Sequence, residues 1–171
     1  MKKGLDYAKG QVQEFHEAFG HPVANTPTAI EPKLAVARTI WTAEELVEFL
    51  YATANNDKEL FGKLMAKLYN GIEAAEQKVL NSGAIIENPL VDQMDALTDV
   101  NYFVQGSFVV AGVNPQPLFD IVQDANMAKL WEDGKPRYDE NNGGKIKKPE
   151  GWEAPEPKLL AEIKKQMKEV K

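Results

Sequence analysis

Apolar residues recur at intervals of three or four positions through most of the first 130 residues. This spacing gathers side chains on one face of an α-helix. The pattern predicts helices at about 7–20, 33–55, 58–80, 90–111 and 115–130. No alternation of apolar and polar residues is long enough for the strands of a central sheet, so the predicted fold class is all-α.

Residues that begin or end helices stand at the predicted boundaries. Gly20, which a His-Pro pair follows, is typical of a helix end. Asp57 is a good N-cap for the third helix, and Asn114 is a cap followed by Pro115, a favoured first-turn residue. The connectors are short, which favours an antiparallel bundle of four to five helices.

The character of the chain changes after residue 130. Residues 134–152 have few apolar side chains, and the Asn-Asn-Gly-Gly sequence at their centre predicts a small hairpin or turn. A short, charged terminal helix is predicted at about 157–170. We therefore expect an all-α domain over residues 1–130 and an extended, partly irregular C-terminal tail over residues 131–171 that packs on the same domain.

The composition is that of a soluble globular protein, with 171 residues, 43% of them hydrophobic and 27% charged. No apolar run approaches the roughly 18–20 residues that cross a bilayer. No apolar stretch follows the N-terminal lysines, as it would in a secretory signal. The absence of cysteine excludes disulfides, thiolate metal sites and cysteine nucleophiles. We expect a cytoplasmic protein that does not bind membranes.

The net charge of −6 is unevenly distributed along the chain. Residues 1–130 carry a net charge of −7, whereas residues 131–171 carry +1. An acidic body disfavours nucleic acid as a partner, because nucleic-acid backbones require a basic face. Acidic residues suit the capture of divalent cations, although they also serve solubility alone. The placement of the carboxylates decides between these readings.

Two of the predicted helices each carry a row of carboxylates. The first row, at i, i+3 and i+7 spacing on one helix face, is formed by Asp92, Asp95 and Asp99. The second row is formed by Glu44, Glu45 and Glu48. If the two rows face each other, four to six carboxylates converge, and their repulsion requires cations between them. Mg²⁺ or Mn²⁺ with oxygen ligands is the chemical match.

The alternative is that both rows are solvated stripes on helix surfaces. Bulky apolar neighbours, such as Leu46 and Phe49, weigh against that alternative. Glu73 and Glu76 have the same i, i+3 spacing, but their neighbours are polar, and we interpret this pair as a solvated face.

The sequence lacks the residues that several other kinds of functional site require. A di-iron bundle requires Glu-x-x-His pairs, and neither His16 nor His21 follows a glutamate at that distance. The Gly-Gly-Lys sequence at 143–145 lacks the earlier glycine and the following Ser or Thr of a phosphate-binding loop. No Gly-x-Ser-x-Gly motif occurs for a serine hydrolase.

The order of these motifs resembles the all-α nucleoside triphosphate pyrophosphohydrolases, a superfamily that includes MazG proteins, dimeric dUTPases and phosphoribosyl-ATP pyrophosphatase. Arg38 precedes the Glu-Glu-x-x-Glu sequence at 44–48, and the acidic segment 95–103 follows. The Asn-x-x-Lys element at 126–129 and the Lys-Pro-Glu-Gly-Trp sequence at 148–152 are similar to later motifs of the group.

The resemblance implies hydrolysis of a nucleoside triphosphate to the monophosphate and pyrophosphate, in a homodimer or tetramer. It implies Glu45, Glu48 and Asp99 as the main metal ligands. Where the family carries a glutamate three residues before this aspartate, the chain has Ala96. Asp95 or Asp92 would have to take its place.

We expect Glu44 to act as general base for the attacking water. Arg38 and Lys129 are expected to neutralise the phosphates, with Lys135 and Arg137 as further candidates. Asn101 and Asn126 are candidates for contact with ribose or base. The aromatic candidates for stacking on the base are Phe15, Tyr102 and Trp131.

Two other functions stay open at this point. Ala96 is compatible with a regulatory protein that binds nucleotide and metal but turns over little substrate. A structural helical oligomer, with acidic rows that only solvate it, is the third possibility.

Overall fold

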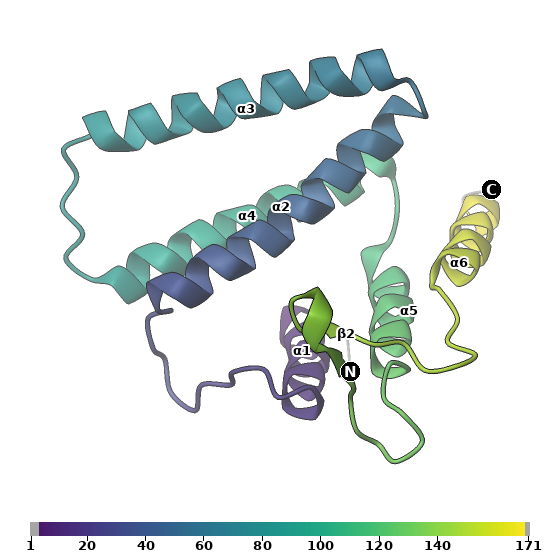
Figure 1. Ribbon diagram of the computed structural model, residues 1–171. Coiled ribbons are helices and arrows are strands. Elements are labelled where there is room, and N and C mark those ends of the chain that lie inside the picture. Colours follow the sequence, from purple (N-terminus) through teal and green to yellow (C-terminus); the bar gives the residue numbers. More distant parts are fainter. Residues whose placement is uncertain (1–3, 170–171) are drawn as a thin grey trace. The chain divides into compact units, whose positions relative to one another are not determined.

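The computed structural model describes residues 4–169 and is mostly helical (Figure 1). The α-helices are α1 (Leu5–Ala18), α2 (Pro32–Ala54), α3 (Lys58–Asn81), α4 (Pro89–Ala111), α5 (Pro115–Met127) and α6 (Glu156–Glu169). A two-stranded antiparallel sheet joins β1 (Tyr138–Asp139) to β2 (Lys145–Ile146), with a short 3₁₀ turn, Glu140–Asn142, between them. The all-α prediction is confirmed, and each helix lies within a few residues of its predicted position.

The helix ends follow the local chemistry of the sequence. The Asp57 carboxylate accepts a hydrogen bond from the Leu60 backbone N–H at 3.0 Å and so caps α3. The Asn114 side chain accepts from the Gln116 N–H at 3.3 Å at the start of α5. Helix α1 ends at Ala18, two residues before the predicted end. Gly20 has a φ of +65°, a left-handed conformation that cannot be part of a right-handed helix, so the helix has to end before it.

The described chain divides into two compact units. The first, here called the terminal unit, contains residues 4–26 and 98–169, and so both ends of the described chain. The second, the central unit, contains residues 27–97. The division falls within α4, which is one continuous helix.

In the terminal unit, α5 packs against both α1 and α6. The buried Gln123 donates through its side-chain amide to the Gln11 backbone oxygen at 2.8 Å. The Gln11 amide in turn donates to the Asp120 carboxylate at 3.0 Å. This polar network fixes the register of α1 on α5, because shifting either helix by one residue would leave half-buried groups without partners.

The C-terminal tail is fastened to the terminal unit by long-range hydrogen bonds. The Trp152 indole N–H donates to the Ala125 carbonyl at 2.8 Å. Gln166 of α6 exchanges two hydrogen bonds with the backbone of Asn114, at 2.8 and 3.2 Å. The β-hairpin is attached to the end of α1 by the Tyr138 hydroxyl, which donates to the Phe19 carbonyl. The hydrogen bonds of Trp152 and Gln166 join segments that are distant in sequence, so the tail packs on the helices that precede it.

In the central unit, α2 and α3 form an antiparallel hairpin (Figure 1). They pack where the turn joins them, around the buried Ala54 and an edge-to-face contact of Tyr51 with Phe61, whose ring centroids are 5.2 Å apart. The Gln93 side chain of α4 bonds both the N–H and the carbonyl of Ile30, at 2.7 and 3.0 Å. These two bonds hold the connector before α2 against α4.

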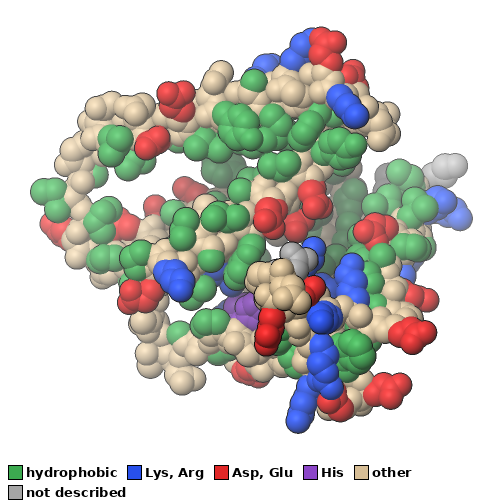
Figure 2. Space-filling model, viewed as in Figure 1, with side chains coloured by type: hydrophobic (Ala, Val, Ile, Leu, Met, Phe, Trp, Pro, Cys, Tyr) green, Lys and Arg blue, Asp and Glu red, His purple; other side chains and the backbone are tan. Residues whose placement is uncertain are grey.

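Little of the apolar surface is buried in the described chain. Phe19 and Ala54 are its buried hydrophobic residues. Every residue of α3 from Tyr69 to Asn81 is exposed. Figure 2 shows hydrophobic side chains at the surface along this helix. Within residues 4–169, no helix combines the length and the apolarity needed to cross a membrane.

Candidate functional site

The glutamate row lies in the middle of α2, within the central unit. All three side chains, Glu44, Glu45 and Glu48, are exposed. In the part of the chain that the structure describes, none of them takes part in an ion pair or a side-chain hydrogen bond. Their oxygens are therefore free to accept an external ligand.

The aspartate row lies along α4, as the spacing predicted. Asp92 and Asp95 belong to the part of α4 in the central unit, whereas Asp99 belongs to the part in the terminal unit. Because α4 is continuous, the three side chains share one helix face. They are exposed, and within residues 4–169 they too have no ion pair or side-chain hydrogen bond.

Carboxylate oxygens are the ligands that Mg²⁺ and Mn²⁺ prefer, so the donor chemistry of the two rows fits these ions. Residues 4–169 contain no group of three or more His, Cys, Asp or Glu side chains placed to hold one metal ion. The structure thus gives the residues of each row a common helix face but does not by itself assemble a closed metal cage.

The predicted substrate contacts on α2 and α4 are accessible. Arg38 is exposed on α2, two turns before Glu45. On α4, Asn101 is half-buried, and Tyr102 is 75% exposed beside Phe103, with ring centroids 6.4 Å apart. Tyr102 therefore presents most of its ring to solvent.

Asn126 and Lys129 are brought together at the end of α5. The Lys129 ammonium donates to the Asn126 side-chain oxygen at 2.7 Å, and both residues are half-buried. Burial lowers the pKa of Lys129 below the usual lysine value, and the positive charges of Lys148 and Lys145 lower it further. The asparagine and the lysine of the predicted Asn-x-x-Lys element are therefore in direct contact.

Two further candidates from the tail, the cation Arg137 and the aromatic residue Trp131, contact each other. The Arg137 guanidinium pairs with Asp133 at 2.8 Å and lies over the Trp131 ring, 5.6 Å from its centroid. The hydrogen bond from Arg137, together with one from the Lys135 backbone N–H, lowers the pKa of Asp133. These contacts close the turn after α5.

Comparison with known proteins decides which family this arrangement belongs to. The phosphoribosyl-ATP pyrophosphohydrolase family model matches residues 12–126, which contain both carboxylate rows. The chain belongs to the phosphoribosyl-ATP pyrophosphohydrolase family. The resemblance drawn from Arg38 and the acidic motifs is therefore confirmed.

A solved structure agrees with this membership of the pyrophosphohydrolase family. The crystal structure of a protein from Exiguobacterium sp. 255-15, titled a "putative NTP pyrophosphohydrolase", is similar with a TM-score of 0.90. The two sequences are 44% identical, and the similarity covers 99% of this chain and 100% of that one. No curated protein matches the chain.

The family match ends at residue 126, and beyond it the structure brings together side chains whose contacts the sequence analysis did not predict. The Lys148 ammonium lies 3.9 Å from the centroid of the Trp152 ring, and the Lys129 ammonium lies 5.9 Å from the same centroid. The positive charge of Lys145 also lowers the pKa of Lys129. The signal for this cluster was present in the sequence, as three lysines within four residues shortly before a tryptophan.

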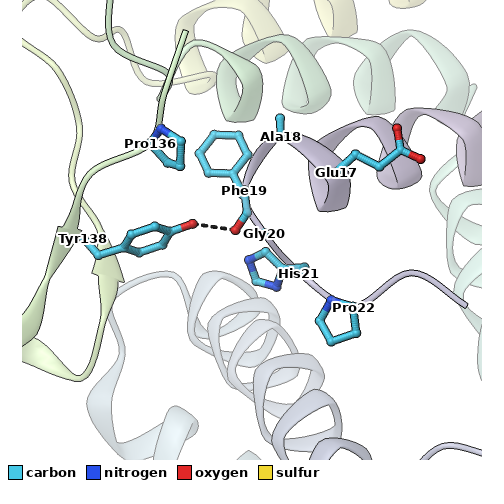
Figure 3. Close-up of a pocket in the computed structure, with 8 residues that line it drawn as sticks. All are labelled: Glu17, Ala18, Phe19, Gly20, His21, Pro22, Pro136 and Tyr138. Carbon is cyan, nitrogen blue, oxygen red and sulfur yellow. Dashed lines mark hydrogen bonds between the residues drawn. The ribbon is translucent and has the colours of Figure 1, made fainter. Parts of the chain in front are cut away.

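An open hollow of about 600 Å³ lies at the end of α1 in this family member (Figure 3). It is lined by residues 17–22 together with Pro136 and Tyr138, whose hydroxyl donates to the Phe19 carbonyl at 2.5 Å. Phe15 stacks on Phe19 with centroids 4.2 Å apart, so one face of this predicted stacking residue is covered. Neither carboxylate row lines the hollow.

Proposed function

We propose that this chain is a Mg²⁺-dependent nucleoside triphosphate pyrophosphohydrolase. It hydrolyses the bond between the α- and β-phosphates of an NTP or dNTP and releases the nucleoside monophosphate and pyrophosphate. The observation that carries the proposal is the two rows of carboxylates without partners in the described chain, within the region that matches the family. Carboxylates that neutralise no cation of their own chain are available to metal ions.

The metal ligands in this proposal come from both rows. Mg²⁺ would be held by Glu45, Glu48, Asp95 and Asp99, with Asp92 as the alternative to Asp95. When bound, the ion would lower the pKa of a coordinated water and neutralise charge on the phosphates. Mn²⁺ has similar preferences for oxygen ligands and could replace it.

The side chains of the protein carry out the proton transfer and the positioning. Glu44 accepts a proton from the attacking water as the water oxygen bonds to the α-phosphorus. The bond from that phosphorus to the oxygen that bridges to the β-phosphate breaks, and its electron pair leaves with pyrophosphate. Arg38 and Lys129 place positive charge against the phosphates, where charge-assisted hydrogen bonds are strongest.

The nucleoside is assigned to three polar or aromatic side chains. Asn126 and Asn101 contact ribose or base through their amides, and Tyr102 offers an exposed ring for stacking. The amide donors and acceptors can read either a base edge or a sugar hydroxyl.

Self-association into a homodimer, or a tetramer of two dimers, is part of the same proposal. The exposed half of α3 supports it, because Ile72 and Val79 are 56% and 71% exposed and lie two turns apart on one face. A monomer in water would leave this apolar face solvated at a cost of about 25 cal/mol for each Å². A second copy of the chain would bury it.

The test is pyrophosphate release from a panel of NTPs and dNTPs with Mg²⁺, with and without EDTA. We expect release from at least one nucleotide, and its loss when EDTA removes the metal. Asp99→Asn and Glu48→Gln should abolish turnover without loss of fold, since removing a repelling carboxylate does not destabilise the metal-free protein.

Glu73→Gln is the matched control, because Glu73 is an exposed helix carboxylate outside both rows. It should keep the activity of the natural sequence. Full activity of Asp99→Asn or Glu48→Gln would refute the metal ligands proposed above.

Ala96 favours one second candidate, a nucleotide- and metal-binding protein with little turnover. The same panel separates the two. If no nucleotide yields pyrophosphate while one raises the melting temperature in the presence of Mg²⁺, the binding function replaces the hydrolytic one.

A further inference from the structure

The two histidines of the chain lie side by side where the chain leaves α1. His16 belongs to the last turn of the helix, and His21 follows the left-handed residue Gly20. Their ring centroids are 5.2 Å apart, and the ring planes are tilted by 35°. Both side chains are half-buried and belong to the terminal unit. The fold of this one unit therefore brings two imidazole rings together.

The surroundings of His16 decide which of its ring nitrogens is available. Its Nδ1 lies 2.9 Å from the Pro22 carbonyl oxygen. A carbonyl oxygen only accepts hydrogen bonds, so Nδ1 carries the proton and donates it. In a neutral imidazole the other nitrogen, Nε2, then keeps its lone pair. A histidine that donates one ring N–H to a carbonyl and offers its other nitrogen has the usual arrangement of a metal ligand.

Aromatic neighbours and the backbone hold His21 in place. The Phe15 ring lies beside the His21 ring, with centroids 5.6 Å apart, and stacks in turn on the buried Phe19 at 4.2 Å. The His21 backbone N–H donates to the His16 carbonyl at 2.8 Å, which closes the reversal of the chain. His21 also lines the open hollow at the end of α1 (Figure 3). The hollow leaves room for a ligand beside this ring.

The spacing of the two rings suits one shared metal ion. Two imidazoles on a tetrahedral zinc ion, each with a Zn–N bond of about 2.1 Å, have ring centroids roughly 5 Å apart. The observed separation of 5.2 Å is close to this value. Imidazole nitrogens suit Zn²⁺, Ni²⁺ and Cu²⁺, whereas Mg²⁺ prefers the oxygens that the carboxylate rows offer. The pair therefore favours a different class of ion from the rows.

We propose that His16 and His21 together bind a divalent transition-metal ion, with Zn²⁺ as the reference ion. The protein ligands are the His16 Nε2 and one ring nitrogen of His21. Residues 4–169 contain no group of three such ligands, so water takes the remaining positions. With two protein ligands this is an open site that binds more weakly than a structural zinc site with four. It uses no residue of the carboxylate rows and does not depend on the proposed hydrolysis.

The experiment titrates Zn²⁺ into the protein, which carries no affinity tag, in excess Mg²⁺ so that the carboxylates hold the ion that they prefer. Calorimetry measures the affinity and the stoichiometry. His16→Gln and His21→Gln should each weaken Zn²⁺ binding at least about tenfold, because each removes one of the two protein ligands. Zn²⁺ should raise the melting temperature of the natural sequence more than that of either variant, since an ion that binds the folded state stabilises it.

Glu14→Gln and Glu48→Gln are the controls. Glu14 is an exposed carboxylate of α1, and Glu48 belongs to the glutamate row. Each substitution should change the Zn²⁺ affinity by less than about twofold. Unfolding curves recorded without Zn²⁺ show whether each variant keeps its fold.

NMR of the natural sequence gives a second measurement that needs no variant. The chain has two histidines, so the imidazole signals of both can be followed during the titration. Both sets of signals should shift with the same apparent affinity, because one ion contacts both rings.

Three results would overturn the proposal. The first is natural affinity in both histidine variants. The second is a shift of one set of imidazole signals alone, which would indicate that a single histidine binds the ion. The third is a loss in Glu48→Gln as large as in the histidine variants, which would assign the Zn²⁺ to the glutamate row. Pyrophosphate release is measured separately, and its failure would leave these outcomes unchanged.

Discussion

The two units of this protein differ in the contacts that hold them together. In the terminal unit, side chains reach across long stretches of sequence to backbone groups, as Gln123 does to Gln11 and Trp152 does to Ala125. In the central unit, Gln93 makes such a connection to Ile30, but the second half of α3 is exposed throughout. Directional bonds specify a single packing, whereas an exposed apolar face specifies only that something must cover it.

The difference shows where a second chain would matter most. The terminal unit has its buried polar groups largely paired within one chain, the exception in the described residues being the Gln11 side-chain oxygen. The central unit carries the glutamate row on a helix pair whose apolar surface is uncovered. If the proposed self-association holds, the stability of the central unit depends on protein concentration, and the stability of the terminal unit depends on it less.

The largest expected effect comes from charging the exposed face of α3. Ile72→Glu combined with Val79→Glu should weaken self-association at least about 100-fold, because each buried side chain of this size contributes about 1.5–3 kcal/mol. Sedimentation velocity over a range of concentrations measures the change. Gln77→Glu, which adds a charge at a polar position of the same helix, should leave association unchanged. A natural sequence that stays monomeric at all concentrations would contradict the proposed homodimer.

The next effect concerns the polar connection of the central unit. Gln93→Leu removes both hydrogen bonds to Ile30 and leaves its backbone groups unpaired, so we expect a loss of about 2 kcal/mol in the free energy of unfolding. Urea unfolding measures it. Gln105→Leu, an exposed glutamine of the same helix, is the control and should change stability by less than about 0.5 kcal/mol. Equal stability of the two variants would show that the connection is not important.

A smaller effect is expected in the terminal unit from one hydroxyl group. Tyr138→Phe removes the hydrogen bond to the Phe19 carbonyl and should cost about 1 kcal/mol in urea unfolding. Tyr51→Phe is the control in the central unit, since its ring packs edge-to-face on Phe61 and the substitution keeps that contact. If both variants lose the same stability, the Tyr138 bond is not specific.

The smallest effect is a dependence on pH. The hydrogen bond from Gln166 lowers the pKa of Glu162 below its ordinary value of 4.5, and Lys165 acts in the same direction. A lowered carboxyl pKa stabilises the folded state above that ordinary value, and the contribution is lost as the pH falls through the folded value. Glu162→Gln should therefore reduce the loss of stability between pH 6 and pH 3. Glu169→Gln, on the same helix, should not, and equal pH profiles for both would contradict the prediction.

The sequence was sufficient for the helices because local signals determine them. Asp57 and Asn114 cap the helices that they were predicted to cap, since capping needs only the neighbouring backbone. The hairpin predicted from Asn-Asn-Gly-Gly is present for the same reason, with Gly143 and Gly144 both at positive φ.

The contacts of the candidate site could be predicted from the sequence only in part, because many of them join segments that are distant in sequence. The contact of Asn126 with Lys129 could be predicted, since the two residues are one helical turn apart. The approach of Lys148 to Trp152 and Lys129 could not, because it depends on how the tail returns to α5. Arg137 was a candidate for phosphate binding, yet Asp133, four residues earlier, pairs with it.

The continuity of α4 sets a length scale for any metal site. An α-helix rises about 1.5 Å per residue, so Asp92 and Asp99 are separated by roughly 10 Å along its axis and Asp95 and Asp99 by roughly 6 Å. The oxygens around one Mg²⁺ lie about 2.1 Å from it, which places opposite ligands only about 4 Å apart. Asp95 and Asp99 can therefore approach the same ion, whereas Asp92 and Asp99 would have to serve two different ions. Counting the ions bound by Asp92→Asn and Asp95→Asn would show which spacing the enzyme uses.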